Sequence, residues 1–68
     1  MNRLREIRMK QNLRQIDLAQ KADVSLTWIW VLENGFQQRV SQEIQSRVAR
    51  ALGCSVEEIF GSHEKAPR

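Results

Sequence analysis

The sequence predicts an all-helical domain, and three observations support this. Apolar residues recur at three- and four-residue spacing in five short segments, which is the period of amphipathic helices. Serine and glycine residues separate these segments where helices begin and end. The only proline, Pro67, lies near the end of the chain, so no proline interrupts the periodic part. We therefore expect one cooperative helical domain over residues 1–60, followed by a flexible tail over residues 61–68.

Two short helices are predicted at the start of the domain. The first covers about residues 2–10, with Leu4 and Ile7 on one face. The second covers about residues 15–21 and has Asp17 in its first turn, where the helix dipole favours a negative charge. The side chains of this second helix that we expect to face inward are Ile16, Leu18, Ala19 and Ala22.

The third helix follows a short turn at residues 22–24. Ser25 can cap the start of this helix through its hydroxyl, and Gly35 marks its end. The turn needs a residue that tolerates a positive φ. Asp23 meets this need because short polar side chains visit that region more readily than most.

Two further helices follow a polar loop over residues 36–40. Ser41 can cap the fourth helix, which Gly53 ends, and Ser55 with Glu58 forms a capping box for a short fifth helix. The inward-facing residues expected from these two helices are Ile44, Val48, Ala51, Leu52, Val56, Ile59 and Phe60.

Composition excludes several classes of protein. The single cysteine, Cys54, cannot form an intramolecular disulfide or supply the ligand set of a structural zinc site. His63 has no carboxylate or cysteine arranged near it, and we expect it to be inert. No nucleophile with a base, carboxylate pair, glycine-rich phosphate loop or metal-ligand spacing occurs. We therefore expect no enzyme activity, no cofactor and no metal.

The net charge of +3 is modest, but it is unevenly distributed. Residues 1–14 carry five basic side chains against one acidic side chain, residues 15–35 are slightly acidic, and arginines follow again at 39, 47 and 50. A polyanion would therefore be bound from both flanks of the central segment. No apolar run approaches the roughly 18 residues that a membrane span needs, so we expect a cytoplasmic protein.

Residues 15–35 have the residue types that a helix-turn-helix unit requires. Ala19 is small enough to allow two short helices to approach closely. The apolar side chains that such a unit must bury between its helices are Leu18, Val24, Ile29 and Leu32.

This pattern resembles that of the Cro/repressor-like (XRE-type) helix-turn-helix family over about residues 3–60. The matching motifs are Arg14-Gln15-x-x-Leu18-Ala19, Val24-Ser25, Ile29, Leu32-Glu33-Asn34-Gly35, Ala51-Leu52-Gly53 and the run from Ser55 to Phe60. The resemblance implies a compact five-helix bundle of the phage-repressor DNA-binding-domain type, in which helices two and three form the helix-turn-helix. It also implies a transcriptional regulator that binds double-stranded DNA.

The resemblance implies roles for residues on both sides of the third helix. Gln15 occupies the position that holds a DNA phosphate, and Arg14 lies beside it at the helix N-terminus. Glu33 and Arg8 match a pair that some family members form. The loop residues expected at phosphates are Gln37, Gln38 and Arg39, although this loop is about one residue longer than the usual pattern.

The third helix departs from its relatives because it has few side chains that can form hydrogen bonds with bases. With Ile29, Leu32 and Glu33 set inward, the residues that point fully outward are Thr27, Val31 and Asn34. Trp30 points mostly outward, and Leu26 and Trp28 lie at the borders. The residues that we place at the major groove are Ser25, Leu26, Thr27, Trp28, Trp30, Val31 and Asn34. Contacts to thymine methyls and DNA shape would then supply much of the discrimination.

The two tryptophans have other possible roles. Trp28 can cover the second helix as a border residue of the core, and Trp30 can lie against Phe36 in a small satellite cluster. A third interpretation is that the exposed apolar surface binds a protein partner.

Our leading hypothesis is a repressor that acts as a homodimer on an inverted repeat. We expect dimer contacts from residues 53–60, because Ile59 and Phe60 make this region more apolar than so small a core needs. The alternative is an antitoxin-like or accessory protein-interaction module that uses the tryptophan-rich helix as its partner surface.

Overall fold

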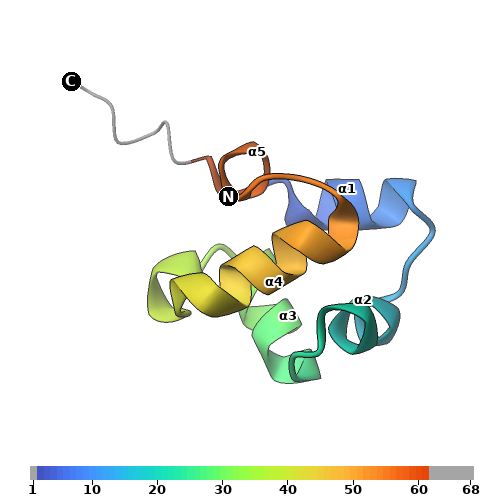
Figure 1. Ribbon diagram of the computed structural model, residues 1–68, viewed down its shortest axis with the longest axis horizontal. Helices are drawn as coiled ribbons and strands as arrows, with labels where there is room; N and C mark the ends of the chain where they lie inside the picture. Colours follow the sequence, from blue (N-terminus) through green and yellow to red (C-terminus); the bar gives the residue numbers. More distant parts are fainter. Residues whose placement is uncertain (1, 62–68) are drawn as a thin grey trace.

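Helices account for most of residues 2–61, the part of the chain that the computed structural model describes. They are α1 (Leu4–Lys10), α2 (Gln15–Ala22), α3 (Leu26–Glu33), the 3-10 helix η1 (Gln37–Arg39), α4 (Gln42–Leu52) and α5 (Val56–Phe60). Figure 1 shows α4 lying diagonally across the molecule, with α1 and α5 to one side of it and α2 and α3 to the other. The predicted all-helical fold is confirmed. The tail predicted for residues 61–68 lies outside the described residues, apart from Gly61.

Serine side chains cap the three helices for which the sequence predicts them. The hydroxyl of Ser25 accepts the N–H of Trp28 at 3.3 Å, and the hydroxyl of Ser41 accepts the N–H of Ile44 at 3.3 Å. Ser55 forms the predicted capping box with Glu58. Each cap satisfies a backbone N–H that has no partner inside its own helix. These bonds fix where α3, α4 and α5 begin.

The turn between α2 and α3 is closed by backbone contacts. Asp23 has a φ of 60°, the left-handed conformation predicted for it. The N–H of Val24 donates to the carbonyl of Ala19 at 3.0 Å. From α4, the Arg47 guanidinium donates to the Asp23 carbonyl at 3.2 Å. Helix α2 packs against both α3 and α4, so this turn holds the helix pair against the rest of the domain.

The core lies where all five α-helices meet. Its fully buried large side chains are Leu4, Leu18, Ile29, Leu32, Val48 and Ile59. One predicted core residue is misplaced, because 38% of Ile16 is exposed. The buried face of α2 is centred between Leu18 and Ala19, and at 100° per residue Ile16 lies about 110° from that centre. Ile16 therefore sits at the edge of the helix interface.

Ile59 and Phe60 belong to the core, so the reason that we gave for expecting dimer contacts from residues 53–60 is wrong. They are only 1% and 4% exposed. Helix α5 packs on both α1 and α4, and the N–H of Arg3 donates to the Ile59 carbonyl at 2.9 Å. The exposed residues of this region are Gly53, Ser55, Glu57 and Glu58, which are small or polar. The apolar side chains that look like a surplus in the sequence are used to pack α5 against α1 and α4.

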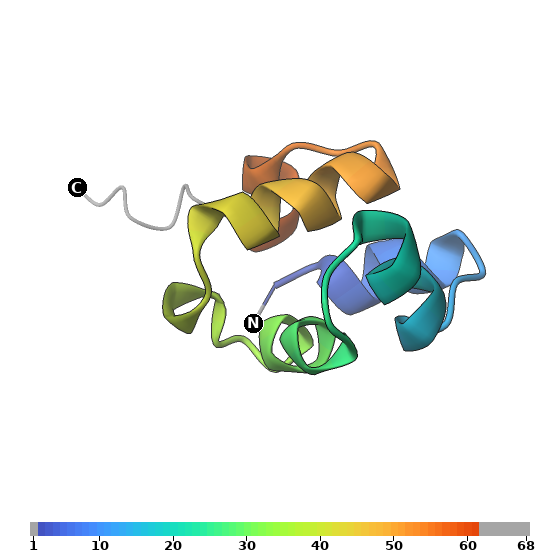
Figure 2. The same ribbon diagram turned by 60° about the horizontal axis from the view of Figure 1, so that its bottom comes forward.

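The predicted loop over residues 36–40 contains the helix η1, which Figure 2 shows between the end of α3 and the start of α4. Gln45 of α4 is 9% exposed, and its Nε2 donates to the carbonyls of Gln37 at 2.8 Å and Val40 at 2.9 Å. Val40 is itself buried. One polar side chain of α4 thus stabilises the backbone conformation of residues 37–40. Within residues 2–61, no helix is long and apolar enough to span a membrane.

Candidate nucleic-acid interface

Helix α3 presents one buried and one exposed face. Ile29 and Leu32 have no exposed surface, whereas Leu26, Trp28 and Trp30 are 43%, 37% and 55% exposed. Ser25 and Thr27 are exposed as well. This agrees with the predicted wheel for the buried face and places both tryptophans at least partly in solvent. Apolar side chains therefore make up much of the exposed surface of α3.

Val31 is the exception to the predicted outward face. It is half-buried and packs against the core, although the wheel placed it fully outward. After α3 the chain turns back, and the N–H of Phe36 donates to the Val31 carbonyl at 3.2 Å. This turn brings the next segment beside Val31. A helical wheel does not account for burial by residues outside the helix.

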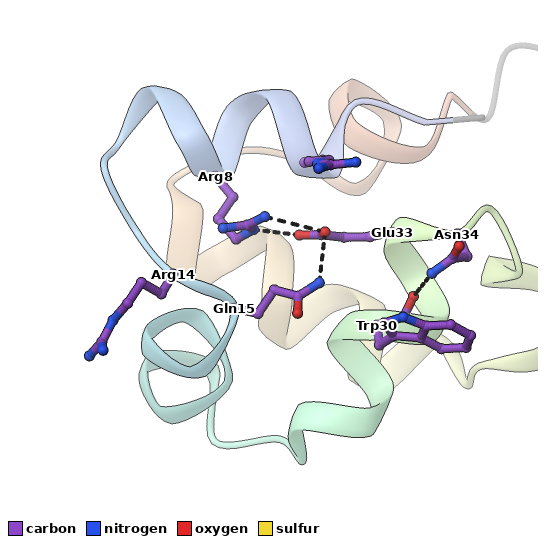
Figure 3. Close-up of a pocket in the computed structure, with 7 residues that line it drawn as sticks. Arg8, Arg14, Gln15, Trp30, Glu33 and Asn34 are labelled. Atoms are coloured by element: carbon purple, nitrogen blue, oxygen red, sulfur yellow. Dashed lines mark hydrogen bonds and ion pairs between the residues drawn. The ribbon is translucent and has the colours of Figure 1, made fainter.

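Glu33 accepts hydrogen bonds from two other helices. Figure 3 shows Arg8 of α1 and Gln15 of α2 both reaching its carboxylate. The Gln15 amide donates at 3.0 Å, and the Arg8 guanidinium donates through Nε and Nη2. Arg8 also donates from Nη1 to the Leu13 carbonyl at 2.6 Å. These bonds join the end of α3 to α1 and to the start of α2.

A surface hollow of about 560 Å³ surrounds this network. It is lined by Arg5, Arg8, Arg14, Gln15, Trp30, Glu33 and Asn34. The Glu33 side chain is only 5% exposed and is bonded to Arg8, so its negative charge is largely compensated. The hollow therefore favours an anion. Arg5 was not among the predicted site residues; its position three residues before Arg8, on one side of a helix, is the signal that could have identified it.

Arg14 lies at the outer edge of this hollow and bonds within its own helix turn. In Figure 3 its side chain points away from Glu33, and 78% of it is exposed. It donates from Nε and Nη2 to the two carboxylate oxygens of Asp17, both at 2.9 Å. The Arg14 backbone N–H also donates to Asp17, at 2.8 Å. These hydrogen bonds lower the pKa of the Asp17 carboxyl to about 2.

The polar residues predicted at the major groove are mostly bonded to the protein itself. Ser25 caps α3. The Asn34 amide donates to the Trp30 carbonyl at 2.7 Å, as Figure 3 also shows. Among residues 2–61, no side-chain hydrogen bond is made by Thr27, Trp28 or Trp30, which leaves one hydroxyl and two indole N–H groups available on this helix.

The segment after α3 divides into an inward and an outward part. The side-chain oxygen of Gln37 accepts from the amide of Asn2 at 3.1 Å, so Gln37 bonds within the protein. Gln38 and Arg39 are exposed. The Arg39 guanidinium lies 5.7 Å from the centre of the Phe36 ring, a cation–π distance. Of the three loop residues predicted to bind phosphate, Gln38 and Arg39 are thus the more accessible.

A short helix pair joined by a tight turn, held in a five-helix bundle, defines a helix-turn-helix protein. Comparison with family models agrees, because the model described as Helix-turn-helix domain matches residues 2–59. The chain therefore belongs to the helix-turn-helix domain family, which confirms the family predicted from its motifs. DNA binding is the function that this domain suggests. Neither the curated proteins nor the solved structures give a significant match.

Proposed function

We propose that this protein is a transcriptional regulator that binds specific sequences of double-stranded DNA with α3 in the major groove. The observation that carries the proposal is the exposed face of α3 beside the hollow that contains Arg5, Arg8 and Arg14. The major groove admits an α-helix, and cationic side chains beside such a helix contact the phosphates that border the groove.

In this proposal phosphates are bound on both sides of α3. Arg5, Arg14 and Gln15 bind on the side of the hollow, where Gln15 also lies at the N-terminal end of α2. Exposed Gln38 and Arg39 bind on the other side. The hydrogen bond from Gln15 to Glu33 uses one of the two amide hydrogens. The second hydrogen remains for a phosphate oxygen, and the first holds the amide in place.

We further propose that two copies bind an inverted repeat and repress transcription by occupying the site. Dimeric helix-turn-helix proteins place their recognition helices one helical turn of DNA apart, roughly 34 Å. The burial of Ile59 and Phe60 removes them as dimer contacts. The homodimer is tested by comparing the stoichiometry of binding on duplexes with one half-site and with two.

Salt titration of duplex binding tests the phosphate contacts. The logarithm of the binding constant should fall steeply with the logarithm of salt concentration, and Arg5→Gln should reduce that slope by about 0.9 if it removes one phosphate contact. Arg50→Gln is the matched control, because Arg50 is also exposed but lies on α4, outside this hollow. It should leave the slope unchanged. No measurable binding to duplex DNA at low salt would contradict the proposal.

A further inference from the structure

The hydrogen-bonding groups of α3 are largely used inside the protein. Glu33 is held by Arg8 and Gln15, the Asn34 amide bonds to the backbone of Trp30, and Ser25 caps the helix. No lysine, arginine or glutamine occurs between residues 25 and 34. Those are the side chains that most often recognise guanine and adenine through paired hydrogen bonds. Apart from the Thr27 hydroxyl and the two indole N–H groups, α3 therefore has little capacity to read bases by hydrogen bonding.

Hydrocarbon surface is what α3 offers instead. Leu26, Trp28 and Trp30 are all more than a third exposed, and they lie on the helix that belongs to the helix-turn-helix unit. In the major groove, the distinctive apolar group on an unmodified base pair is the 5-methyl of thymine. Cytosine presents no equivalent group unless it is methylated at the same carbon.

We propose that α3 recognises DNA through pyrimidine 5-methyl groups, chiefly those of thymine, packed against Leu26, Trp28 and Trp30. The proposal rests on the DNA-binding function proposed above and specifies what that function reads. Each contacted methyl is transferred from water to an apolar surface, which is favourable in proportion to the area buried.

The charges around this face favour DNA over a protein as its occupant. Trp30 lines the same hollow as Arg5 and Arg14, and exposed Arg39 follows α3 in the chain. The only charged residue of α3 itself is Glu33, which is paired with Arg8 and only 5% exposed. Exposed apolar side chains with cations beside them match a groove whose floor carries methyl groups and whose walls carry phosphates.

Uracil substitution tests the proposal without changing the protein. A duplex site is first selected from a random library, and each thymine in it is then replaced by deoxyuridine, which removes the methyl group and keeps every hydrogen-bonding group. Each replacement at a contacted position should weaken binding about fourfold, the value for one buried methyl. Replacing the same thymine–adenine pair by 5-methylcytosine–guanine should weaken binding less than replacing it by unmethylated cytosine–guanine.

A double-mutant cycle, which combines a uracil substitution in the DNA with a substitution in the protein, then identifies the side chain that contacts each methyl group. Trp30→Ala should weaken binding to the thymine duplex and weaken binding to the uracil duplex much less, because the two changes remove one contact. Met9→Ala is the matched control, since Met9 is 58% exposed but lies on α1. Its affinity should equal that of the wild type on both duplexes.

The two proposals fail in different ways. If neither duplex binds at low salt, the DNA-binding function itself is wrong. If the thymine and uracil duplexes bind equally tightly at every position, the protein binds DNA but methyl recognition is wrong. If Trp30→Ala also leaves both affinities unchanged, the apolar face of α3 does not read DNA, and a protein partner becomes its better occupant.

Discussion

Arg8 and Glu33 form an ion pair that is almost closed to water. The two side chains are 10% and 5% exposed, and they come from α1 and α3, 25 residues apart in the chain. Gln15 adds a bond from α2 to the same carboxylate. One acidic side chain therefore links the proposed recognition helix to both preceding helices.

Removing the charge of Glu33 should destabilise the domain strongly. Glu33→Gln leaves the Arg8 guanidinium buried without a counter-charge, and breaking a buried pair in this way costs about 3 kcal/mol. Urea denaturation should show this loss as a lower midpoint. The double variant Arg8→Met/Glu33→Leu should recover most of it, because it leaves no buried charge. If the single variant loses less than about 1 kcal/mol, the pair is not an important support of α3.

Gln45 should be important for the path of residues 37–40. Gln45→Ala leaves the carbonyls of Gln37 and Val40 without their side-chain donor, at a cost of about 1–3 kcal/mol. The substitution should increase the rate of amide hydrogen exchange more in residues 37–40 than in α2. Gln42→Ala, at an exposed position of the same helix, is the control and should change neither stability nor exchange. Equal effects of the two substitutions would contradict the proposed support.

The contribution of Asp17 should disappear in acid. Its pKa is lowered from 3.8 to about 2 by hydrogen bonds from Arg14, so the ionised form is favoured in the folded state. This stabilisation is present above about pH 4 and is lost as the pH falls towards about 2. The melting temperature of Asp17→Asn should thus lie below that of the wild type near neutral pH, and the gap should close over that acidic range. A gap that is constant with pH would show that the carboxylate charge is not its cause.

Substitutions at two large residues of α3 should affect stability and DNA binding separately. Leu32 has no exposed surface, so Leu32→Ala should cost about 3–5 kcal/mol by leaving a cavity, which is most of the stability of a domain of this size. Trp30 is 55% exposed, and Trp30→Ala should cost less than about 1 kcal/mol while weakening DNA binding. Chemical denaturation and a DNA titration on the same samples test both statements. A large loss of stability in Trp30→Ala would assign Trp30 to the core.

The elements of this fold were predictable because their signals are local. Each serine cap depends on a hydroxyl and the N–H three residues later, and the turn at Asp23 depends on the φ of one residue. The spacing of Ile29 and Leu32 likewise reports one face of one helix. Sequence patterns of this kind need no knowledge of what packs against the helix.

Apart from Ile16, the errors concern residues whose burial depends on segments outside their own helix. Ile59 and Phe60 look like surplus apolar surface until α1 and α4 are placed against α5. Val31 looks exposed until residue 36 folds back beside it. Gln45 looks like an ordinary surface glutamine, and only the path of residues 37–40 gives its amide two acceptors. The apolar exposed face of α3 was predicted, but its ligand cannot be derived from helical periodicity.

The hydrogen bond from the N–H of Arg3 to the carbonyl of Ile59 has a consequence for how the protein is made. Within this domain α1 is synthesised before α5, one of the helices against which it packs. The apolar face of α1 is therefore incompletely covered until residue 60 has emerged. The complete core can therefore form only after α5 has been synthesised.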